Sequence, residues 1–410
     1  MTEKIAKPHL RFAGFDDTWE QRKLGDIVGI YDGVHQTPNY QNSGVMFLSV
    51  ENIATLKSSK FISEEDFKRD YKVYPQENDI LMTRIGDVGT TNVVTDNGLK
   101  AYYVSLALLK YNSTDPYFLS NAIQSDYVQK GLANRTLKTA IPMKINKDEI
   151  GKVSVMLPLS ATEQQQIGKY FRSLDHLITL HQRKYDKLTN VKKSMLEKMF
   201  PKNGSNVPEI RFKGFSDAWE QRKLGDIVER VVRKNTNNES SLPLTISAQY
   251  GLVDQITYFN NRVASRDVSN YYLVLNGEFA YNKSTSDGFP FGAVKRLDLY
   301  EKGVLSTLYI VFSIKNQSEI DSDYLTVFFD TDRWHKGVSE RAAEGARNHG
   351  LLNISADDFF DIDIFLPVHK EEQVVIGSYL RHLDNLITLH QRELEKLKNL
   401  KKACLEKMFV

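Results

Sequence analysis

The chain is poor in several residue types and patterns that define other protein classes. It has one cysteine, Cys404, among 410 residues, which excludes an internal disulfide and a multi-cysteine zinc site. Its nine histidines show no ligand spacing such as HExxH. No run of about 18 uncharged apolar residues occurs, and the first ten residues, MTEKIAKPHL, contain no apolar signal segment. We therefore expect a cytoplasmic protein without a structural metal.

Net positive charge is also scarce. The formal net charge is +2, and residues 29–156 carry 14 basic and 14 acidic side chains. Residues 229–365 carry 14 basic and 19 acidic side chains, while 157–200 and 366–410 are mildly basic. Nucleic-acid binders usually have a strongly basic face, so charge alone does not indicate one. A hydrophobic content of 41% over this length predicts a globular protein of two or three domains.

The most informative feature that is present is an internal duplication. The segment PHLRFAGFDDTWEQRKLGDIV at 8–28 matches 208–228 at 16 of 21 positions. Residues 163–200 match 372–409 at 25 of 38 positions, sharing LITLHQR and LEKMF. Because the intervening segments hardly resemble each other, the chain consists of a repeated frame that carries two different inserts.

Each frame ends in a predicted long helix, since only Gly168 interrupts the helix-favouring residues between Thr162 and Pro201. Apolar positions recur at alternating steps of four and three, which is a near-heptad seam. The predicted seam contains Leu174, Ile178, His181, Tyr185, Leu188, Lys192, Met195 and Met199, and then Leu383, Ile387, His390, Leu394, Leu397, Lys401, Cys404 and Met408. Neither helix buries its stripe alone, so we expect an antiparallel coiled-coil pair with pseudo-two-fold symmetry. The two seam histidines are interpreted as structural.

The repeat order also predicts a closed chain. The second motif directly follows the first helix, so by symmetry the first motif should lie beside the end of the second helix, with Phe12 near Phe409. Trp19 and Trp219 are expected to pack against helix ends. We place a first domain at 1–156, a helix and linker at 157–207, a second domain at 208–365 and the second helix at 366–410.

Both inserts read as mixed α/β domains, with short strand-like runs such as VMFLSV and NDILMTRI between turns. Polar loops between these runs are candidates for DNA contact, because Arg and Lys bond guanine and Asn and Gln bond adenine. The alternative, ordinary solvated loops, stays open for each residue. The candidates are His35, Gln36, Asn39, Tyr40, Arg84, Asn134, Arg135, Lys138, Arg233, Lys234, Asn282, Lys283, Ser284, Arg341, Arg347 and Asn348.

The tandem motif ending WEQRKLGDIV and the two helices ending LEKMF resemble the specificity subunits of type I restriction-modification enzymes over the whole chain. The stretch NDILMTRIGDVG at 78–89 and the Leu-Pro pair before each helix are similar to that family too. The resemblance implies two domains that each read half of a split, asymmetric DNA site. It also implies two methylation subunits docked on the helices, which bind S-adenosylmethionine, and two restriction subunits that use ATP and Mg²⁺.

Two other function classes, an enzyme and a scaffold, fit the sequence less well. A methyltransferase needs a glycine-rich methyl-donor loop and an Asn-Pro-Pro-Tyr-like motif, and a motor needs GxxxxGK[ST]; the sequence has none of these. The carboxylates Asp357, Asp358, Asp361 and Asp363 are interpreted as the solvated face of a strand. A coiled-coil scaffold would explain the helices but would give the two large inserts no role. We therefore expect a non-catalytic subunit.

Overall fold

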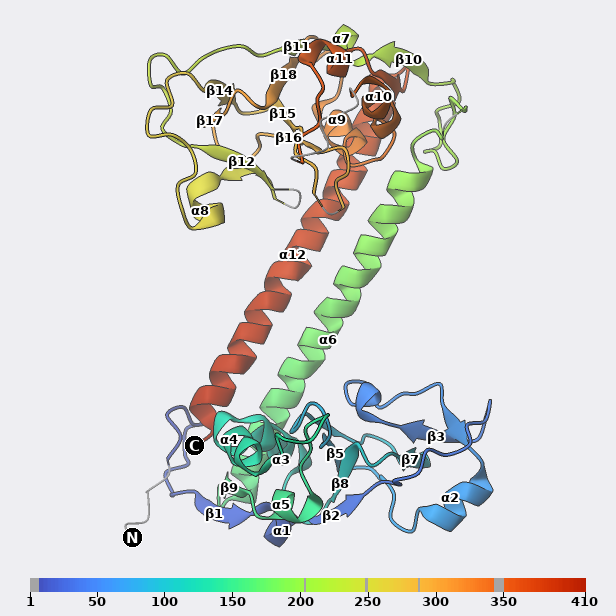
Figure 1. Cartoon of the computed structure of the whole chain (residues 1–410), viewed down its shortest axis with the longest axis vertical. Coiled ribbons are helices and arrows are strands. Elements are labelled where there is room, and N and C mark those ends of the chain that lie inside the picture. Colours follow the sequence, from blue (N-terminus) through green and yellow to red (C-terminus); the bar gives the residue numbers. More distant parts are fainter. Residues whose placement is uncertain (1–6, 203, 248–249, 287, 343–349) are drawn as a thin grey trace. The chain divides into compact units, whose positions relative to one another are not determined.

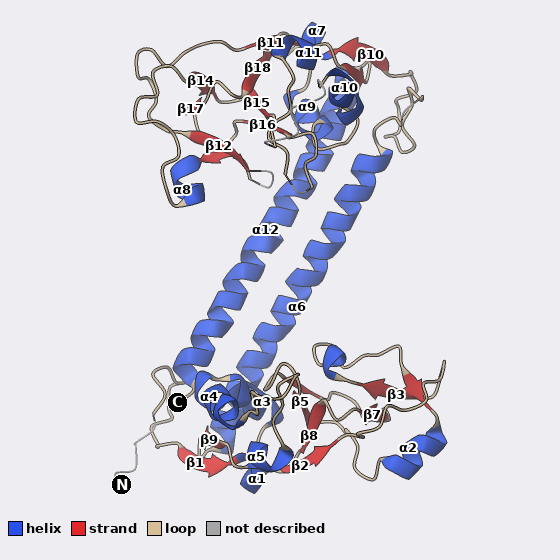
Figure 2. Ribbon diagram, viewed as in Figure 1, coloured by secondary structure: helices blue, strands red, loops and turns tan. Residues whose placement is uncertain are grey.

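The computed structural model describes residues 7–202, 204–247, 250–286, 288–342 and 350–410. Its contacts divide the chain into two compact units, the first formed by residues 1–183 and 391–410 and the second by residues 184–390. Each unit holds one insert and a portion of both long helices. Figure 1 labels the elements and Figure 2 colours them by type.

The first unit contains a four-stranded antiparallel sheet in the order β2-β8-β5-β6. A second sheet, β4-β3-β7, includes the parallel pair β3–β7. The predicted strand-like runs VMFLSV and NDILMTRI contain β3 and β5. The elements are β1 (Glu20–Lys23), α1 (Leu24–Ile27), β2 (Gly29–Asp32), β3 (Val45–Leu48), η1 (Val50–Asn52), β4 (Phe61–Ile62), α2 (Glu64–Asp70), β5 (Ile80–Thr83), β6 (Thr91–Val93), β7 (Lys100–Tyr102), β8 (Leu106–Lys110), α3 (Pro116–Gln124), α4 (Asp126–Arg135), α5 (Lys147–Gly151) and β9 (Ser154–Leu157).

The second unit repeats the four-stranded sheet in the equivalent order β11-β18-β15-β16. In place of the second sheet it has two separate two-stranded pairs, β12–β13 and β14–β17. The inserts therefore share one sheet and differ in the rest. The elements are β10 (Glu220–Lys223), α7 (Leu224–Ile227), β11 (Val228–Arg230), β12 (Leu244–Ser247), β13 (Gly251–Asp254), α8 (Gln255–Phe259), β14 (Tyr272–Leu275), β15 (Phe279–Asn282), β16 (Ala293–Arg296), β17 (Lys302–Leu305), β18 (Ile310–Ile314), α9 (Ser322–Phe328), α10 (His335–Arg341), α11 (Ala356–Phe360) and β19 (Asp363–Leu366).

The two long helices are α6 (Ala161–Lys198) and α12 (Lys370–Met408). In the first unit, Tyr170 and then Asp175 of α6 meet Cys404 and then Lys401 of α12, so the helices run antiparallel there. In the second unit, Lys192 of α6 binds Asp384 at 2.7 Å. The two ion pairs are equivalent under the repeat, because Lys192 matches Lys401 and Asp175 matches Asp384. The predicted antiparallel pair and its pseudo-symmetry are confirmed.

The repeated motif closes each unit. In the first unit the motif strand β1 pairs antiparallel with β9, and in the second unit β10 pairs antiparallel with β19. Each motif is therefore hydrogen-bonded to the strand that precedes a long helix. Leu10 donates a backbone hydrogen bond of 2.8 Å to Lys407 near the end of α12, and the Trp19 ring lies 6.1 Å from that of Phe409. Trp219 lies 6.0 Å from Phe200. The predicted closure beside the second helix is therefore confirmed, as is the packing of both tryptophans against helix ends.

A buried ion pair joins each motif to the start of a long helix. Arg11 donates to both carboxylate oxygens of Glu163 at 2.6 and 2.8 Å, and Arg211 does the same to Glu372. Both glutamates are fully buried. These bidentate bonds to the carboxylates raise the pKa of each arginine above its ordinary value. The pairs therefore hold the frame in the same geometry in both units.

Candidate nucleic-acid interface

The first candidate loop lies between β2 and β3 in the first unit. His35, Gln36 and Asn39 are exposed there and line a surface groove together with Arg69 and neighbouring acidic groups of α2. A groove lined by imidazole, amides and a guanidinium presents both donors and acceptors for base edges. Helix α2 forms one wall of this groove and could not be predicted from the sequence, because an acidic surface helix carries no signal for DNA contact.

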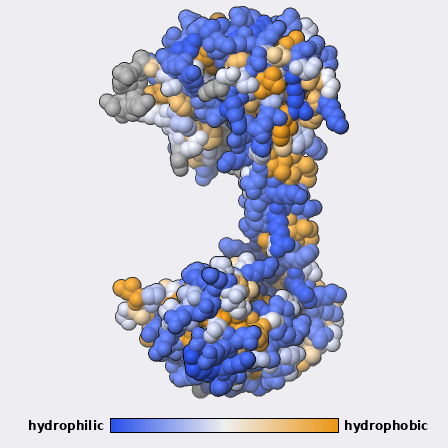
Figure 3. Space-filling model, turned by 90° about the vertical axis from the view of Figure 1, so that its right-hand side faces the viewer, coloured by the Kyte–Doolittle hydropathy of each residue, from blue (hydrophilic) through white to orange (hydrophobic). Residues whose placement is uncertain are grey.

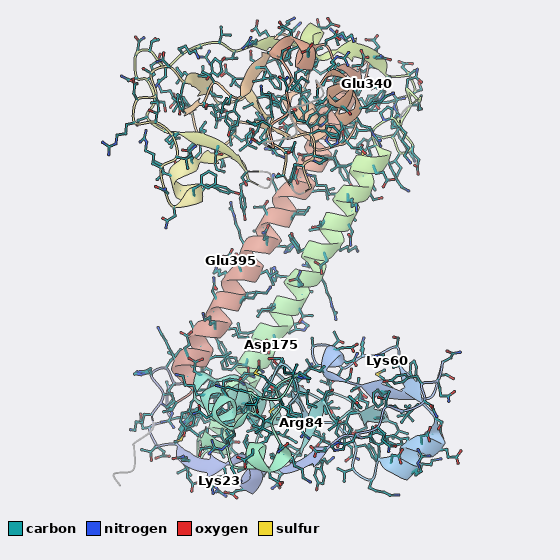
Figure 4. All side chains as sticks on the ribbon, in the orientation of Figure 1. Lys23, Lys60, Arg84, Asp175, Glu340 and Glu395 are labelled. Atoms are coloured by element: carbon teal, nitrogen blue, oxygen red, sulfur yellow. The ribbon has the colours of Figure 1, made fainter. Side chains whose placement is uncertain are left out.

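Tyr40 continues this surface. Its exposed ring packs edge-on against Phe47, with centroids 5.5 Å apart, and the Lys60 ammonium lies 5.5 Å from its centre. The ring is thus packed against Phe47 and lies beside a cation that could contact a phosphate. Lys60, labelled in Figure 4, was not among the predicted residues.

Arg84, also labelled in Figure 4, is placed differently from the other candidates. Its side chain is buried, forms an ion pair with Asp32 and donates from Nε to the carbonyl of Ile145 at 3.0 Å. All of these partners are internal to the first unit. The DNA contact of Arg84 stays a prediction, and the position of its side chain favours a role in holding the 136–145 loop.

The candidates at the end of α4 lie beside that loop. Asn134 is exposed at the last turn, and Arg135 is half-buried, with its guanidinium 4.0 Å from Glu149. Lys138 is exposed in the turn that follows. The structure therefore brings these three residues to one surface of the first unit, next to the strand end that carries Arg84.

In the second unit, the candidates after β11 are engaged by their own domain. Arg233 donates to both oxygens of Glu278 at 2.7 Å. The Lys234 ammonium lies 4.0 Å from the centre of the Tyr272 ring and donates to the carbonyl of Asn270 at 3.0 Å. Each side chain has an internal partner, so DNA contact by either one requires exchange of that partner.

Three of the remaining candidates, Asn282, Lys283 and Ser284, lie at or just after the end of β15. Asn282 accepts from the amide of Ser284 at 3.0 Å, and Lys283 donates to the carbonyl of Ile354 at 3.3 Å. Arg341, at the end of α10, is bonded to Asp361 at 2.6 Å. Ser284 is exposed in a bridge to Leu351. Arg347 and Asn348 lie outside the described residues.

Comparison with known proteins identifies the architecture. The family model described as the type I restriction modification DNA specificity domain matches twice, over residues 16–190 and 216–399. The chain belongs to this family. Its two matched segments are the two target-recognition domains of a type I specificity subunit, each with the helix that follows it. The resemblance predicted from the sequence is thus confirmed.

Similar proteins span the same length. The type I restriction enzyme MjaVIII specificity subunit of Methanocaldococcus jannaschii is 23% identical over 407 residues, covering 94% of this chain and 91% of that protein. A putative type I restriction enzyme MjaX specificity subunit from the same organism is 26% identical with the same coverage. The crystal structure of the type I S subunit from M. genitalium superposes with a TM-score of 0.66 over 98% of this chain and 99% of that one, at 13% identity, which shows a common fold.

The helix seam of this specificity subunit lies where the heptad pattern placed it. Every predicted seam position is buried or half-buried, from Leu174 to Met199 on α6 and from Leu383 to Met408 on α12. The polar seam residue Lys192 binds both Asp384 and Asp330, which follows α9. It thereby ties the second recognition domain to α6 within the second unit. His181 and His390 are half-buried and both have interaction partners.

The acidic run of the second recognition domain needs one correction. Asp357 and Asp358 lie on α11 and Asp361 ends it, so only Asp363 belongs to a strand, β19. Asp361 is bonded to Arg341, and Asp363 pairs with Lys223 at 2.9 Å. Among the described residues, no group of three or more His, Cys, Asp or Glu side chains is placed to hold a metal ion. Within the same residues, no helix is both long and apolar enough to span a bilayer.

Proposed function

We propose that this chain is the non-catalytic, sequence-reading subunit of a type I restriction-modification complex. Each recognition domain reads one half of an asymmetric, bipartite DNA site. The observation that carries this proposal is the repeated frame with two different inserts, because a duplicated reader with two unlike surfaces selects two unlike half-sites. A palindromic site would require two equal surfaces.

Two methylation subunits dock on the paired helices in this proposal. Exposed apolar residues on these helices support it: Leu177 and Leu180 of α6 in the first unit are each about 40% exposed, and Leu389 of α12 in the second unit is 52% exposed. Leu180 and Leu389 occupy equivalent positions of the repeat. Equivalent apolar sites suit two copies of one partner. The methylation subunits bind S-adenosylmethionine and methylate adenine at N6.

Two restriction subunits complete the proposed complex and cleave unmodified DNA with ATP and Mg²⁺. This chain itself binds none of these cofactors. Because its inserts are neutral to acidic overall, phosphate contacts come from local basic clusters and from the methylation subunits. The isolated chain therefore binds DNA weakly and gains affinity on assembly.

A domain exchange tests the proposal against the scaffold alternative. Residues 29–156 are replaced by the corresponding insert of a relative, and the methylated motif is mapped in cells that express the same methylation subunit. A reader changes one half of its motif and keeps the other. A scaffold leaves the motif unchanged.

A further inference from the structure

The loop between α4 and α5 exposes hydrophobic side chains at its tip. Ile141 is fully exposed, at 100% of its possible surface, and Leu137 and Met143 are 44% and 45% exposed. Pro142 between them is exposed as well. Single exposed apolar residues are common, but several on one projecting loop indicate a surface that is covered when the protein binds something. Figure 3 shows one face of the surface, on which several hydrophobic patches interrupt a mainly hydrophilic surface.

This loop is held in place at its base. The amide of Leu137 donates to the carbonyl of Lys144 at 2.8 Å, and the amide of Gly86 donates to that of Met143 at 2.8 Å. The amide of Ile145 donates to the carbonyl of Arg84, whose own side chain returns a bond to the carbonyl of Ile145. The tip is therefore presented by a rigid base and does not fold back onto the domain, which lowers the entropic cost of inserting it into a partner.

The surrounding chain carries the positive charge that the domain as a whole lacks. Residues 127–147 contain five basic side chains and no acidic one, although the insert at 29–156 is balanced. Lys130, Lys138, Lys144 and Lys147 are all exposed and form no ion pair with the described residues. An apolar tip between unpaired lysines matches a polyanion that also offers apolar surface, which DNA does between its stacked bases.

We propose that the loop 137–144 is a DNA wedge of the first recognition domain. Ile141 inserts between two neighbouring base pairs and unstacks them, while Lys138 and Lys144 contact the phosphates on either side. This inference rests on the proposed function, since it requires that the domain bind DNA. Arg84 is a positioning residue in it: buried beside Asp32, it holds the base of the loop from inside the domain.

The same support recurs in the second unit. Lys283 takes the place of Arg84 and donates to the carbonyl of Ile354, and the amide of Leu352 donates to the carbonyl of Lys283. In both domains, the basic residue that directly follows the equivalent strand of the shared sheet, β5 or β15, bonds to a later segment: Arg84 bonds to Ile145, and Lys283 bonds to Leu352 and Ile354. Both copies of the duplicated domain therefore have these hydrogen bonds. The proposed wedge belongs to the first domain.

The test uses the full chain assembled with its methylation subunits on a duplex that contains the methylated motif. 2-Aminopurine is placed at successive positions of the first half-site, excluding the methylated adenine, and its fluorescence reports unstacking. The wild-type complex is expected to brighten the probe at one step. Ile141→Ala should abolish that signal and weaken binding by about tenfold. Leu99→Ala, which truncates a residue 46% exposed in the same unit, is the matched control and should change neither.

The lysines provide a second readout. Lys138→Ala and Lys144→Ala should each lower the slope of log affinity against log salt by about one while leaving the unstacking signal in place. Unchanged binding and fluorescence in Ile141→Ala would overturn the wedge and leave the proposed function intact. Loss of assembly with the methylation subunits in that variant would overturn it by showing a protein contact instead. A wild-type complex that binds no DNA would overturn both proposals.

Discussion

Replacing Gly168 by alanine should loosen the first recognition domain from its long helix. Gly168 is the one glycine of α6, and it faces the N-terminus of α3, where Asp115 caps the helix by accepting from the amide of Phe118 at 2.8 Å. An added Cβ would overlap the Asp115 Oδ1 atom and would lie 3.0 Å from the Phe118 amide nitrogen. The cap must therefore shift or break.

The expected magnitude follows from opposing contributions. Alanine is the better helix former and stabilises α6 by about 1 kcal/mol. Overpacking costs about 1–3 kcal/mol, and loss of the Asp115 cap costs about 1 kcal/mol more. The net effect is a local destabilisation of about 1–3 kcal/mol. By the repeat, Gly377→Ala should act similarly on α9, since its Cβ would lie 2.5 Å from the Tyr324 amide nitrogen.

Hydrogen exchange followed by mass spectrometry measures this effect where it arises. Peptides covering α3 should exchange about 5- to 150-fold faster in Gly168→Ala, as expected for 1–3 kcal/mol of lost protection. The control is Lys169→Ala on the exposed side of the same turn, which should leave α3 unchanged. Unchanged or slower exchange of α3 in Gly168→Ala would refute the reasoning.

Two further predictions concern buried charges. Glu163→Gln should lower the free energy of unfolding of the first unit by about 3–5 kcal/mol, because it leaves the Arg11 guanidinium without its carboxylate partner. Urea unfolding measures this loss. An Arg11→Met/Glu163→Gln double variant should recover part of it. The Asp330 side chain is mostly buried, and although burial opposes its ionisation, Lys295 and Lys192 lower its pKa to about 2. Its ionised form therefore contributes about 2 kcal/mol above pH 4, and this is lost as the pH falls towards 2. Asp330→Asn should flatten that part of the stability-against-pH curve, and an unchanged acid limb would contradict the assignment.

The frame could be predicted from the sequence because its signals are local or repeated. The structure contains the two copies of the frame that the 200- and 209-residue offsets indicate. It also contains the heptad seam and a strand before each long helix. The role of Gly168 could not be predicted, because its neighbour Asp115 is 53 residues away in the chain. The strand predicted for the acidic run was wrong for a different reason. The spacing of its carboxylates fits a strand as well as it fits the short helix α11 followed by Asp361.

The residues proposed to contact DNA are the hardest to predict from the sequence. Arg84 and Lys234 carry the right chemistry, but the fold uses the first in an internal ion pair and places the second over a tyrosine ring. Ile141 was passed over because an isoleucine normally indicates core, and only its full exposure in the structure shows otherwise. The sequence does contain one indication of this loop, the segment 127–147 with basic but no acidic residues. A charge count over the whole domain does not reveal it, because acidic residues elsewhere balance it.

The most direct test of the account is a map of N6-methyladenine across a genome. The chain is co-expressed with its cognate methylation subunit in a host that lacks adenine methylation, and modified positions are located by single-molecule sequencing. The account predicts methylation at a split motif with two different halves. No methylation, while the same methylation subunit works with another specificity subunit, would contradict it.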